Sequence, residues 1–191
     1  MFQGSIVALV TPMHADGSLD MASWQQLLEW HLQEGSHGIV VAGTTGESAT
    51  LSQAEFQQLL STAVTTLGGK IPVLAGTGTN ATASTIQRTQ LAQELGADGA
   101  LVVTPYYNRP SQEGLIAHYE QLANNSDLPL VLYNVPTRTG VDMQPETVAH
   151  LSQLDAFVAL KEANAEPKRL PALLEAVHPD FSLLSGDDPS S

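Results

Sequence analysis

Short apolar segments recur along the chain and alternate with longer segments in which apolar residues are spaced as on one face of a helix. The short segments are rich in β-branched residues and nearly continuous in hydrophobicity, which is typical of parallel strands covered on both faces. We expect seven strands, at residues 5–10, 38–43, 71–76, 99–104, 128–134, 157–161 and 181–186.

The intervening segments carry the start signals of helices. Asp20 is placed as the N-cap of the first helix, and Ser52 with Glu55 forms a capping box before the second. Pro145 and Pro167 are each expected at a first helical position, where the missing N–H of proline costs nothing. The pattern therefore predicts a strict alternation of strands and helices.

Such alternation is compatible with two architectures, an open doubly wound sheet and a closed (β/α)8 barrel. The barrel is favoured because polar, chemically capable residues follow many strands instead of clustering at one switch point. A barrel of this type needs eight strands and usually about 250 residues. With seven visible strands in 191 residues, we expect an α/β fold in which residues 1–191 form an incomplete TIM-barrel catalytic domain, truncated after strand 7.

Composition narrows the possible partners. Seven basic residues against twenty acidic ones leave a net charge of -13, which argues against a surface for nucleic acid or an anionic membrane. The chain has no cysteine, and its six histidines lack the spacing of metal ligands, so we expect no metal. The apolar segment 5–10 is too short to span a bilayer, and a cytoplasmic protein that binds small molecules or other chains is expected.

Lys161 ends the apolar run AFVALKEA at residues 156–163, and it is one of only three lysines. A lysine at a strand end is ordinarily just solvated. Here, however, the preceding apolar residues would bury its stem, and desolvation lowers the pKa of an ammonium, as an amine nucleophile requires. The carboxyl end of a barrel strand also lies on the catalytic face. We therefore expect a Schiff-base lysine.

Tyr133 closes the neighbouring strand in the same way, and Arg138 follows it in the sequence VPTRTG at 135–140. Tyr133 alone would be interpreted as a core aromatic residue, but at this position its hydroxyl could reach Lys161 and move protons. Arg138 could bind a substrate carboxylate with its planar guanidinium, while a surface ion pair is the ordinary alternative.

Glycine-containing turns follow two of the strands. The sequence GTTGES at 43–48 offers Thr44 and Thr45 for a carboxylate or phosphate, although many such turns bind nothing. The sequence GTGTNA at 76–81 resembles a dinucleotide fingerprint, but no acidic residue ends the following strand to hold a ribose. We expect no nucleotide cofactor.

Several motifs, in order and at fitting spacing, resemble the dihydrodipicolinate synthase family of the pyruvate-dependent class I aldolase superfamily. They are GTTGES, TPYYNRPSQEG, LYNVPTRTG, LKEA and LLSGDD, and the resemblance runs from residue 5 to residue 188. It implies a cofactor-free condensation of pyruvate with L-aspartate 4-semialdehyde to 4-hydroxy-tetrahydrodipicolinate, on the diaminopimelate route to lysine. It also implies a homo-oligomer, a dimer of dimers.

The resemblance also implies residue roles. Lys161 matches the lysine that forms an imine with pyruvate, and Tyr133 matches the tyrosine that relays protons in a hydroxyl triad with Thr44 and Tyr107. Tyr107 would reach into the site of the neighbouring subunit. Thr45 matches the threonine that binds the pyruvate carboxylate. Arg138 matches the arginine that binds the semialdehyde.

Two departures from the family pattern bear on regulation and completeness. Ser48, Ala49, Asn80 and Tyr106 match a regulatory cleft for lysine. Phe56 and Ser84, however, stand where lysine-inhibited members tend to carry a histidine and an acidic residue, so weak or no lysine sensitivity is expected. The family's eighth strand, its helix and a small C-terminal helical domain are expected to be absent.

Two alternatives stay open. One is a sibling pyruvate aldolase, such as N-acetylneuraminate lyase or a 2-keto-3-deoxy sugar acid aldolase, which would share the lysine and tyrosine but not the acceptor. The other is a catalytically inactive truncated fragment or interaction module, because an open seven-stranded sheet would expose two unpaired edges.

Overall fold

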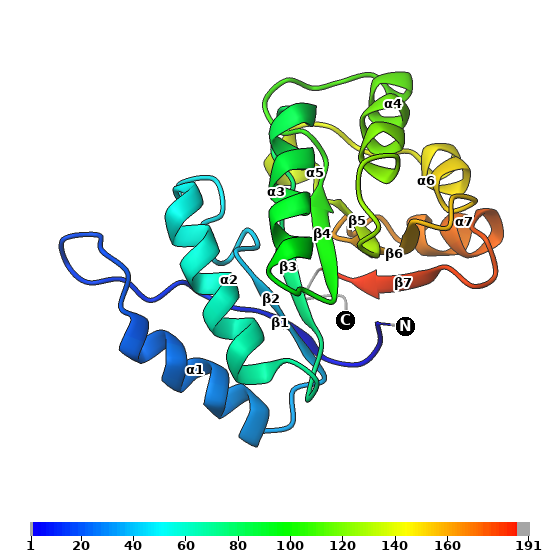
Figure 1. The fold of residues 1–191 in the computed structure, drawn as a ribbon. Helices are drawn as coiled ribbons and strands as arrows, with labels where there is room; N and C mark the ends of the chain where they lie inside the picture. The colour runs from blue at the N-terminus through cyan, green and yellow to red at the C-terminus, as the bar shows by residue number, and fades with distance from the viewer. Residues whose placement is uncertain (1, 187–191) are drawn as a thin grey trace.

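The computed structural model describes residues 2–186, in which seven strands form one parallel sheet in chain order (Figure 1). All seven expected strands are confirmed. Their bounds are β1 (Ile6–Ala8), β2 (Gly38–Val41), β3 (Val73–Gly76), β4 (Gly99–Val103), β5 (Leu130–Asn134), β6 (Phe157–Glu162) and β7 (Ser182–Ser185).

The helices lie around the outside of the curved sheet and connect successive strands (Figure 1). This arrangement confirms the predicted βα alternation and the TIM-barrel class. The helices are α1 (Met21–Gln33), α2 (Gln53–Leu67), α3 (Thr82–Glu94), α4 (Gln112–Ala123), α5 (Pro136–Thr139), α6 (Pro145–Leu151) and α7 (Arg169–Ala176). The short helix α5 was not expected from the sequence.

Alternate strand residues form two separate cores, because successive side chains point to opposite faces of a sheet. Outward residues such as Ile39 and Val41 pack against the helices, together with large buried side chains such as Trp24 and Phe56. Inward residues pack on one another inside the curve of the sheet; they include Val40, Leu74, Leu101, Val131, Tyr133 and Ala159. This double burial explains why the strands are nearly continuously apolar.

The predicted caps of the first helices are confirmed. The Asp20 carboxylate accepts a hydrogen bond from the Ser23 N–H at 3.0 Å. The Ser52 hydroxyl and the Glu55 carboxylate form the reciprocal capping box of α2. Pro145 is the first residue of α6, as expected.

The expected start of a helix at Pro167 was wrong, because α7 begins at Arg169. A helix with Pro167 as its first residue needs a hydrogen bond from the N–H of residue 171 to the carbonyl of residue 167. Residue 171 is itself a proline and has no N–H. The first helical hydrogen bond of α7 instead runs from the Ala172 N–H to the Lys168 carbonyl, at 3.4 Å.

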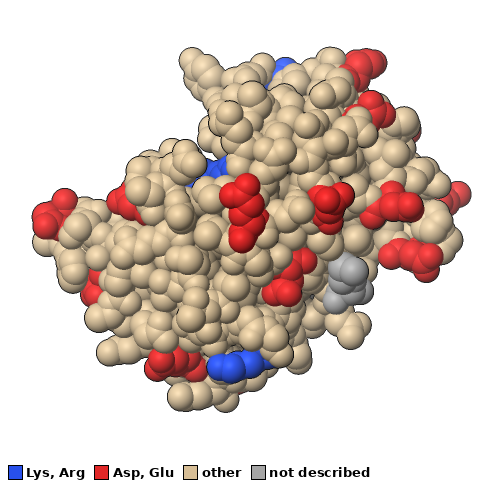
Figure 2. All heavy atoms as spheres, viewed as in Figure 1, with Lys and Arg blue, Asp and Glu red and all other residues tan. Residues whose placement is uncertain are grey.

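The surface carries the acidic excess of the sequence. On the face shown in Figure 2, acidic side chains are spread over the surface, and basic side chains are few. None of the helices within residues 2–186 combines the length and the apolarity needed to cross a membrane.

Candidate active site

A cavity of about 760 Å³ lies inside the curve of the sheet. Apolar inward residues such as Leu74 and Val131 form part of its wall. Five of the six residues predicted for catalysis or substrate binding also line it: Thr44, Thr45, Tyr133, Arg138 and Lys161. The fold therefore brings together side chains from the second, fifth and sixth βα units of the chain.

Lys161 and Tyr133 are direct neighbours on adjacent strands. They pair in register between β5 and β6, so both side chains point into the cavity. The Lys161 Nζ lies 4.8 Å from the centroid of the Tyr133 ring. The contact with the ring face is a cation–π arrangement, and it places the amine beside the phenol.

Burial and two polar neighbours act on the pKa of the Tyr133 hydroxyl. Tyr133 is 6% exposed, and this burial raises the pKa of its hydroxyl, while a hydrogen bond with Thr44 and the positive charge of Arg138 act in the opposite direction. The phenol therefore keeps its proton near neutral pH. Its link to Thr44, whose side chain is exposed, offers a path for protons between the cavity and solvent.

The turn that carries Thr44 and Thr45 is held in a defined shape. The N–H groups of Gly46 and Glu47 donate to the carbonyls of Gly43 and Thr44, both at 3.1 Å. The buried Thr11 hydroxyl donates to the Gly46 carbonyl at 2.7 Å. A rigid turn can present threonine hydroxyls to a ligand without a large entropic cost.

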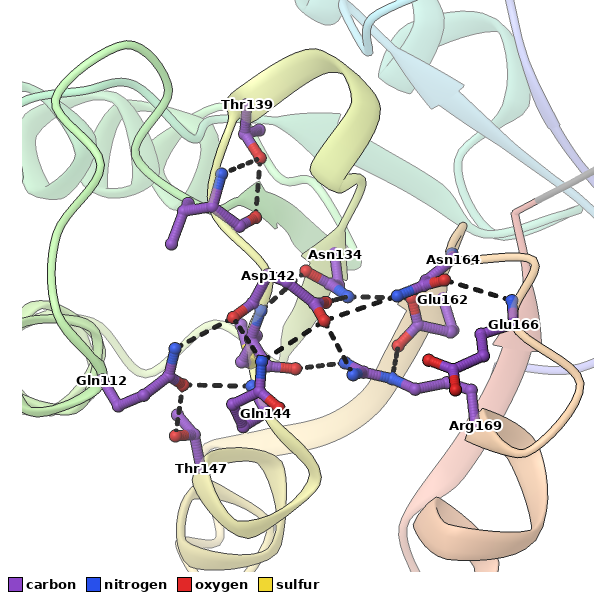
Figure 3. A network of polar contacts seen from close by, with 12 residues as sticks. Gln112, Asn134, Thr139, Asp142, Gln144, Thr147, Glu162, Asn164, Glu166 and Arg169 are labelled. Atoms are coloured by element: carbon purple, nitrogen blue, oxygen red, sulfur yellow. Dashed lines mark hydrogen bonds and ion pairs between the residues drawn. The ribbon is translucent and has the colours of Figure 1, made fainter.

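Arg138 is positioned by the short helix α5. Pro136 starts this helix, and Gly140 ends it with a φ of 76° in the left-handed region. The Thr139 hydroxyl donates to the Val141 carbonyl at 3.0 Å (Figure 3). The same hydroxyl lies 3.2 Å from the Val135 carbonyl. Arg138 is exposed and lines the cavity, where its guanidinium can receive an anionic group.

Gly186 is a site residue that sequence reasoning missed. A Cβ atom built there would lie 2.8 Å from Cε and 2.9 Å from Cγ of Lys161. Real Cβ atoms do not approach so closely, so the absence of a side chain at 186 leaves room for the lysine stem in its present path. Asp187 and Asp188, from the motif LLSGDD, lie outside the described residues.

Tyr107 is the one predicted catalytic residue that does not line the cavity. It is 88% exposed and adopts a φ of 72°, a left-handed conformation that is unfavourable for a residue with a side chain. Its N–H donates to the Thr139 carbonyl at 3.2 Å. Tyr107 thus combines an unfavourable backbone conformation with an aromatic ring that is exposed to solvent.

An arginine that sequence reasoning missed, Arg88, interacts with two of the four residues matched to a regulatory cleft, Ser48 and Tyr106. The Arg88 guanidinium lies 4.3 Å from the centroid of the buried Phe56 ring. Its Nη1 donates to the Ser48 carbonyl at 3.3 Å. Burial lowers the pKa of Arg88, and interaction with Tyr106 opposes this. Of the remaining positions, Asn80 accepts a hydrogen bond on its carbonyl from Asn108 at 2.6 Å, and Ala49 and Ser84 are exposed.

A polar network on the opposite side of β5 and β6 was also missed. It is centred on Arg169 and includes Asn134 and Glu162 (Figure 3). The sequence does indicate where these two residues lie. Asn134 directly follows Tyr133 and Glu162 directly follows Lys161, so on each strand the two neighbouring side chains point to opposite faces of the sheet. Burial raises the pKa of Glu162, and Arg169 opposes this rise.

The expected absence of metal and cofactor stays a prediction. Within residues 2–186, no group of three or more His, Asp or Glu side chains is placed to hold a metal ion. Every residue assigned to the cavity chemistry is an amine, a hydroxyl or a guanidinium, which suits covalent imine chemistry by the chain's own side chains.

Comparison with known proteins shows extensive similarity to one family. The family model described as the dihydrodipicolinate synthetase family matches residues 1–191. A 4-hydroxy-tetrahydrodipicolinate synthase from Cellvibrio japonicus is 51% identical over 188 residues, which cover 98% of this chain and 65% of that protein. Another from Stenotrophomonas maltophilia is 57% identical over 185 residues, 97% of this chain and 62% of that protein. The chain thus spans slightly less than two thirds of these relatives.

Solved structures give the same result. A chloride-inhibited dihydrodipicolinate synthase from Acinetobacter baumannii, crystallised in complex with pyruvate, has a TM-score of 0.96 and 47% identity, covering 98% of this chain and 65% of that one. The enzyme from Aquifex aeolicus has a TM-score of 0.95 and 44% identity, covering 98% and 64%. The chain belongs to the dihydrodipicolinate synthetase family.

Proposed function

We propose that the chain carries out 4-hydroxy-tetrahydrodipicolinate synthase chemistry, condensing pyruvate with L-aspartate 4-semialdehyde. The observation that carries this proposal is the in-register pair of Lys161 and Tyr133, which line one cavity together with Thr44, Thr45 and Arg138. The names of the relatives and the pyruvate complex of the Acinetobacter enzyme support it.

In the first step, the neutral Lys161 amine attacks the C2 carbonyl of pyruvate, and a C–N bond forms. The carbonyl oxygen takes up one proton from the Tyr133 hydroxyl and a second from the attacking Lys161 nitrogen, and it leaves as water as the protonated imine forms. Thr44 returns a proton to Tyr133 from solvent. Thr45 hydrogen-bonds to the pyruvate carboxylate, which orients C2 towards the amine.

In the second step, the protonated imine withdraws electrons and makes the pyruvate methyl group acidic. Loss of one methyl proton gives an enamine, whose carbon attacks the aldehyde of the semialdehyde and forms the new C–C bond; the aldehyde oxygen takes up a proton. The amine of the bound substrate then attacks the imine carbon and displaces Lys161. Ring closure therefore releases the free enzyme.

Arg138 determines the acceptor in this proposal. A guanidinium at the rim of the cavity fits the carboxylate of a small aldehyde by a bidentate contact. Replacing Arg138 with Ala should leave imine formation with pyruvate intact while lowering turnover with the semialdehyde about 100-fold. Arg138→Lys is the matched variant, which keeps the charge but not the planar fork.

The proposal is tested by measuring product formation from pyruvate and L-aspartate 4-semialdehyde. N-acetylneuraminate and 2-keto-3-deoxy sugar acids serve as the alternative substrates of the sibling aldolases. Cleavage of these sugar acids without condensation of the semialdehyde would support the sibling activity. Failure of both reactions in a chain that circular dichroism shows to be folded would support the inactive alternative.

Assembly is part of the proposal. The Tyr107 side chain would complete the hydroxyl triad in the site of a neighbouring copy, which is supported by its exposure of 88% and its absence from the lining of its own chain's cavity. Activity would then require at least a dimer, and we propose the dimer of dimers expected from the sequence. A dihydrodipicolinate synthase variant described as monomeric is also among the similar structures. The cytoplasmic location stays a prediction.

A further inference from the structure

Arg169, the first residue of α7, is a buried arginine that makes three different contacts with one guanidinium. It is 6% exposed. Its Nε donates to Glu162 at 3.0 Å, its Nη1 donates to Asp142 at 3.1 Å, and its Nη2 donates to the Met143 carbonyl (Figure 3). A guanidinium is rigid and planar, so these contacts fix the three acceptors relative to one another.

The same three residues are joined a second time by Asn134, which is fully buried. Its amide nitrogen donates to Asp142 at 2.7 Å and to Glu162 at 2.9 Å. Its amide oxygen accepts from the Met143 N–H at 3.0 Å. Both ends of the Asn134 amide are therefore hydrogen-bonded within the network.

The network lies directly behind the proposed active site. Asn134 and Glu162 pair in register between β5 and β6, one residue beyond the pair of Tyr133 and Lys161. Successive side chains of a strand point to opposite faces of the sheet. The pair of Asn134 and Glu162 therefore faces α7, while the pair of Tyr133 and Lys161 faces the cavity.

A third element of the site is attached through Asp142 and Met143. These residues follow α5, the helix that carries Arg138, by three and four positions. Arg169 thus ties together the end of β5, the end of β6 and the segment after α5. The cavity lining includes Tyr133 from β5, Lys161 from β6 and Arg138 from α5, the helix that precedes the tied segment.

We propose that Arg169 is a positioning residue that, through Asn134, Asp142 and Glu162, sets the spacing between Lys161, Tyr133 and Arg138. This inference rests on the proposed function, because it assigns the network to the imine chemistry. A displacement of reacting groups by about 1 Å can cost about 100-fold in rate. The network touches no substrate and acts only through the elements that it holds.

Arg169→Lys separates geometry from charge. It preserves the cation beside Glu162 and Asp142, but a single ammonium cannot donate along three fixed, coplanar directions. Lys168→Arg is the matched control, because it makes the opposite exchange at the preceding exposed position. Asp142→Asn is a second variant, since it places an N–H donor where a carboxylate oxygen accepts from Asn134 or Arg169.

The experiment measures the rate constant of imine formation at saturating pyruvate, by borohydride trapping over time, in protein that circular dichroism shows to be folded at the assay temperature. We expect a fall of about tenfold or more in Arg169→Lys and in Asp142→Asn, and a change of less than about twofold in Lys168→Arg. A residue that only stabilises the fold would lower the melting temperature and leave the rate of the folded protein unchanged.

The outcomes separate the two proposals. If the unmodified chain traps pyruvate and both folded variants do so at its rate, the positioning role is overturned while the proposed function stands. If Arg169→Lys does not fold, Asp142→Asn decides the question by the same criterion. If the unmodified chain traps no pyruvate, the proposed function fails, and the positioning role fails with it.

Discussion

The Lys161 ammonium lies against the Tyr133 ring, with Nζ 4.8 Å from the ring centroid. The two residues are held there by strand register and not by the chance meeting of two loops. A strand ladder restricts motion along the chain direction much more than a loop does. The amine and the phenol are therefore placed together before any substrate binds.

Replacing Tyr133 with Phe should slow imine formation and turnover by about 100-fold or more, because general acid–base groups contribute about that much. The ring and its contact with Lys161 would remain. Tyr119→Phe is the matched control: its hydroxyl is also buried but donates to the Val102 carbonyl at 3.1 Å, away from the cavity. Equal activity of the two variants in a pre-steady-state trapping assay would contradict the proton role of Tyr133.

Tyr107 is expected to act in a neighbouring subunit, so two inactive variants should complement each other. Tyr107→Phe and Lys161→Ala should each have little activity alone. In an equal mixture that has exchanged subunits, half of the dimers are mixed, and one of their two sites has both residues. Turnover should recover to about a quarter of the unmodified value in a symmetric dimer. No recovery despite subunit exchange, checked by native mass spectrometry, would place Tyr107 outside the partner's site.

L-lysine should inhibit the chain weakly or not at all. The Phe56 ring is buried and lies against the Arg88 guanidinium. This guanidinium also donates to the Ser48 carbonyl. A lysine bound beside Arg88 would add positive charge there. Phe56 and Ser84 could not interact with it as the histidine and the acidic residue of lysine-inhibited members would. Initial rates at millimolar L-lysine should fall little or not at all, and strong saturable inhibition would show that this expectation is wrong.

His118 should make the fold less stable in mild acid. It is 5% exposed, and burial lowers its pKa to about 4, below its unfolded value of about 6.5. Between these values the unfolded chain binds more protons than the folded chain, so stability falls as pH drops through this window. The loss is on the order of 2 to 3 kcal/mol by pH 4.

Urea unfolding between pH 7 and pH 4.5 measures this effect. His118→Gln should flatten the dependence of the unfolding free energy on pH. His150→Gln, at an exposed histidine that contacts Glu120 at 3.0 Å, is the matched control and should keep the steep acid dependence. The same slope in both variants would mean that another group is responsible.

The strands and the central pair of the site were predictable for the same reason. A parallel strand that is buried on both faces has a nearly continuous apolar sequence. Lys161 and Tyr133 each interrupt such a sequence at the carboxyl end of its strand. Neighbouring strands of a barrel then bring the two residues together without further information.

Other parts depend on contacts between distant segments. Arg169 meets Asp142 across 27 residues, and only the packing of α7 shows that its guanidinium is buried. The start of α7 depended on the missing N–H of Pro171, four residues beyond the proline that suggested an earlier start. The four-residue helix α5 is too short to show a helical period in the sequence.

The central claim is that Lys161 forms an imine with pyruvate. The chain has three lysines, Lys70, Lys161 and Lys168, so borohydride reduction with pyruvate, followed by peptide mass spectrometry, assigns an adduct to one of them. We predict one reduced pyruvate on Lys161 and none on the other two, with the adduct lost in Lys161→Ala. A folded chain that is unmodified at Lys161, or modified equally at all three lysines, would contradict the account.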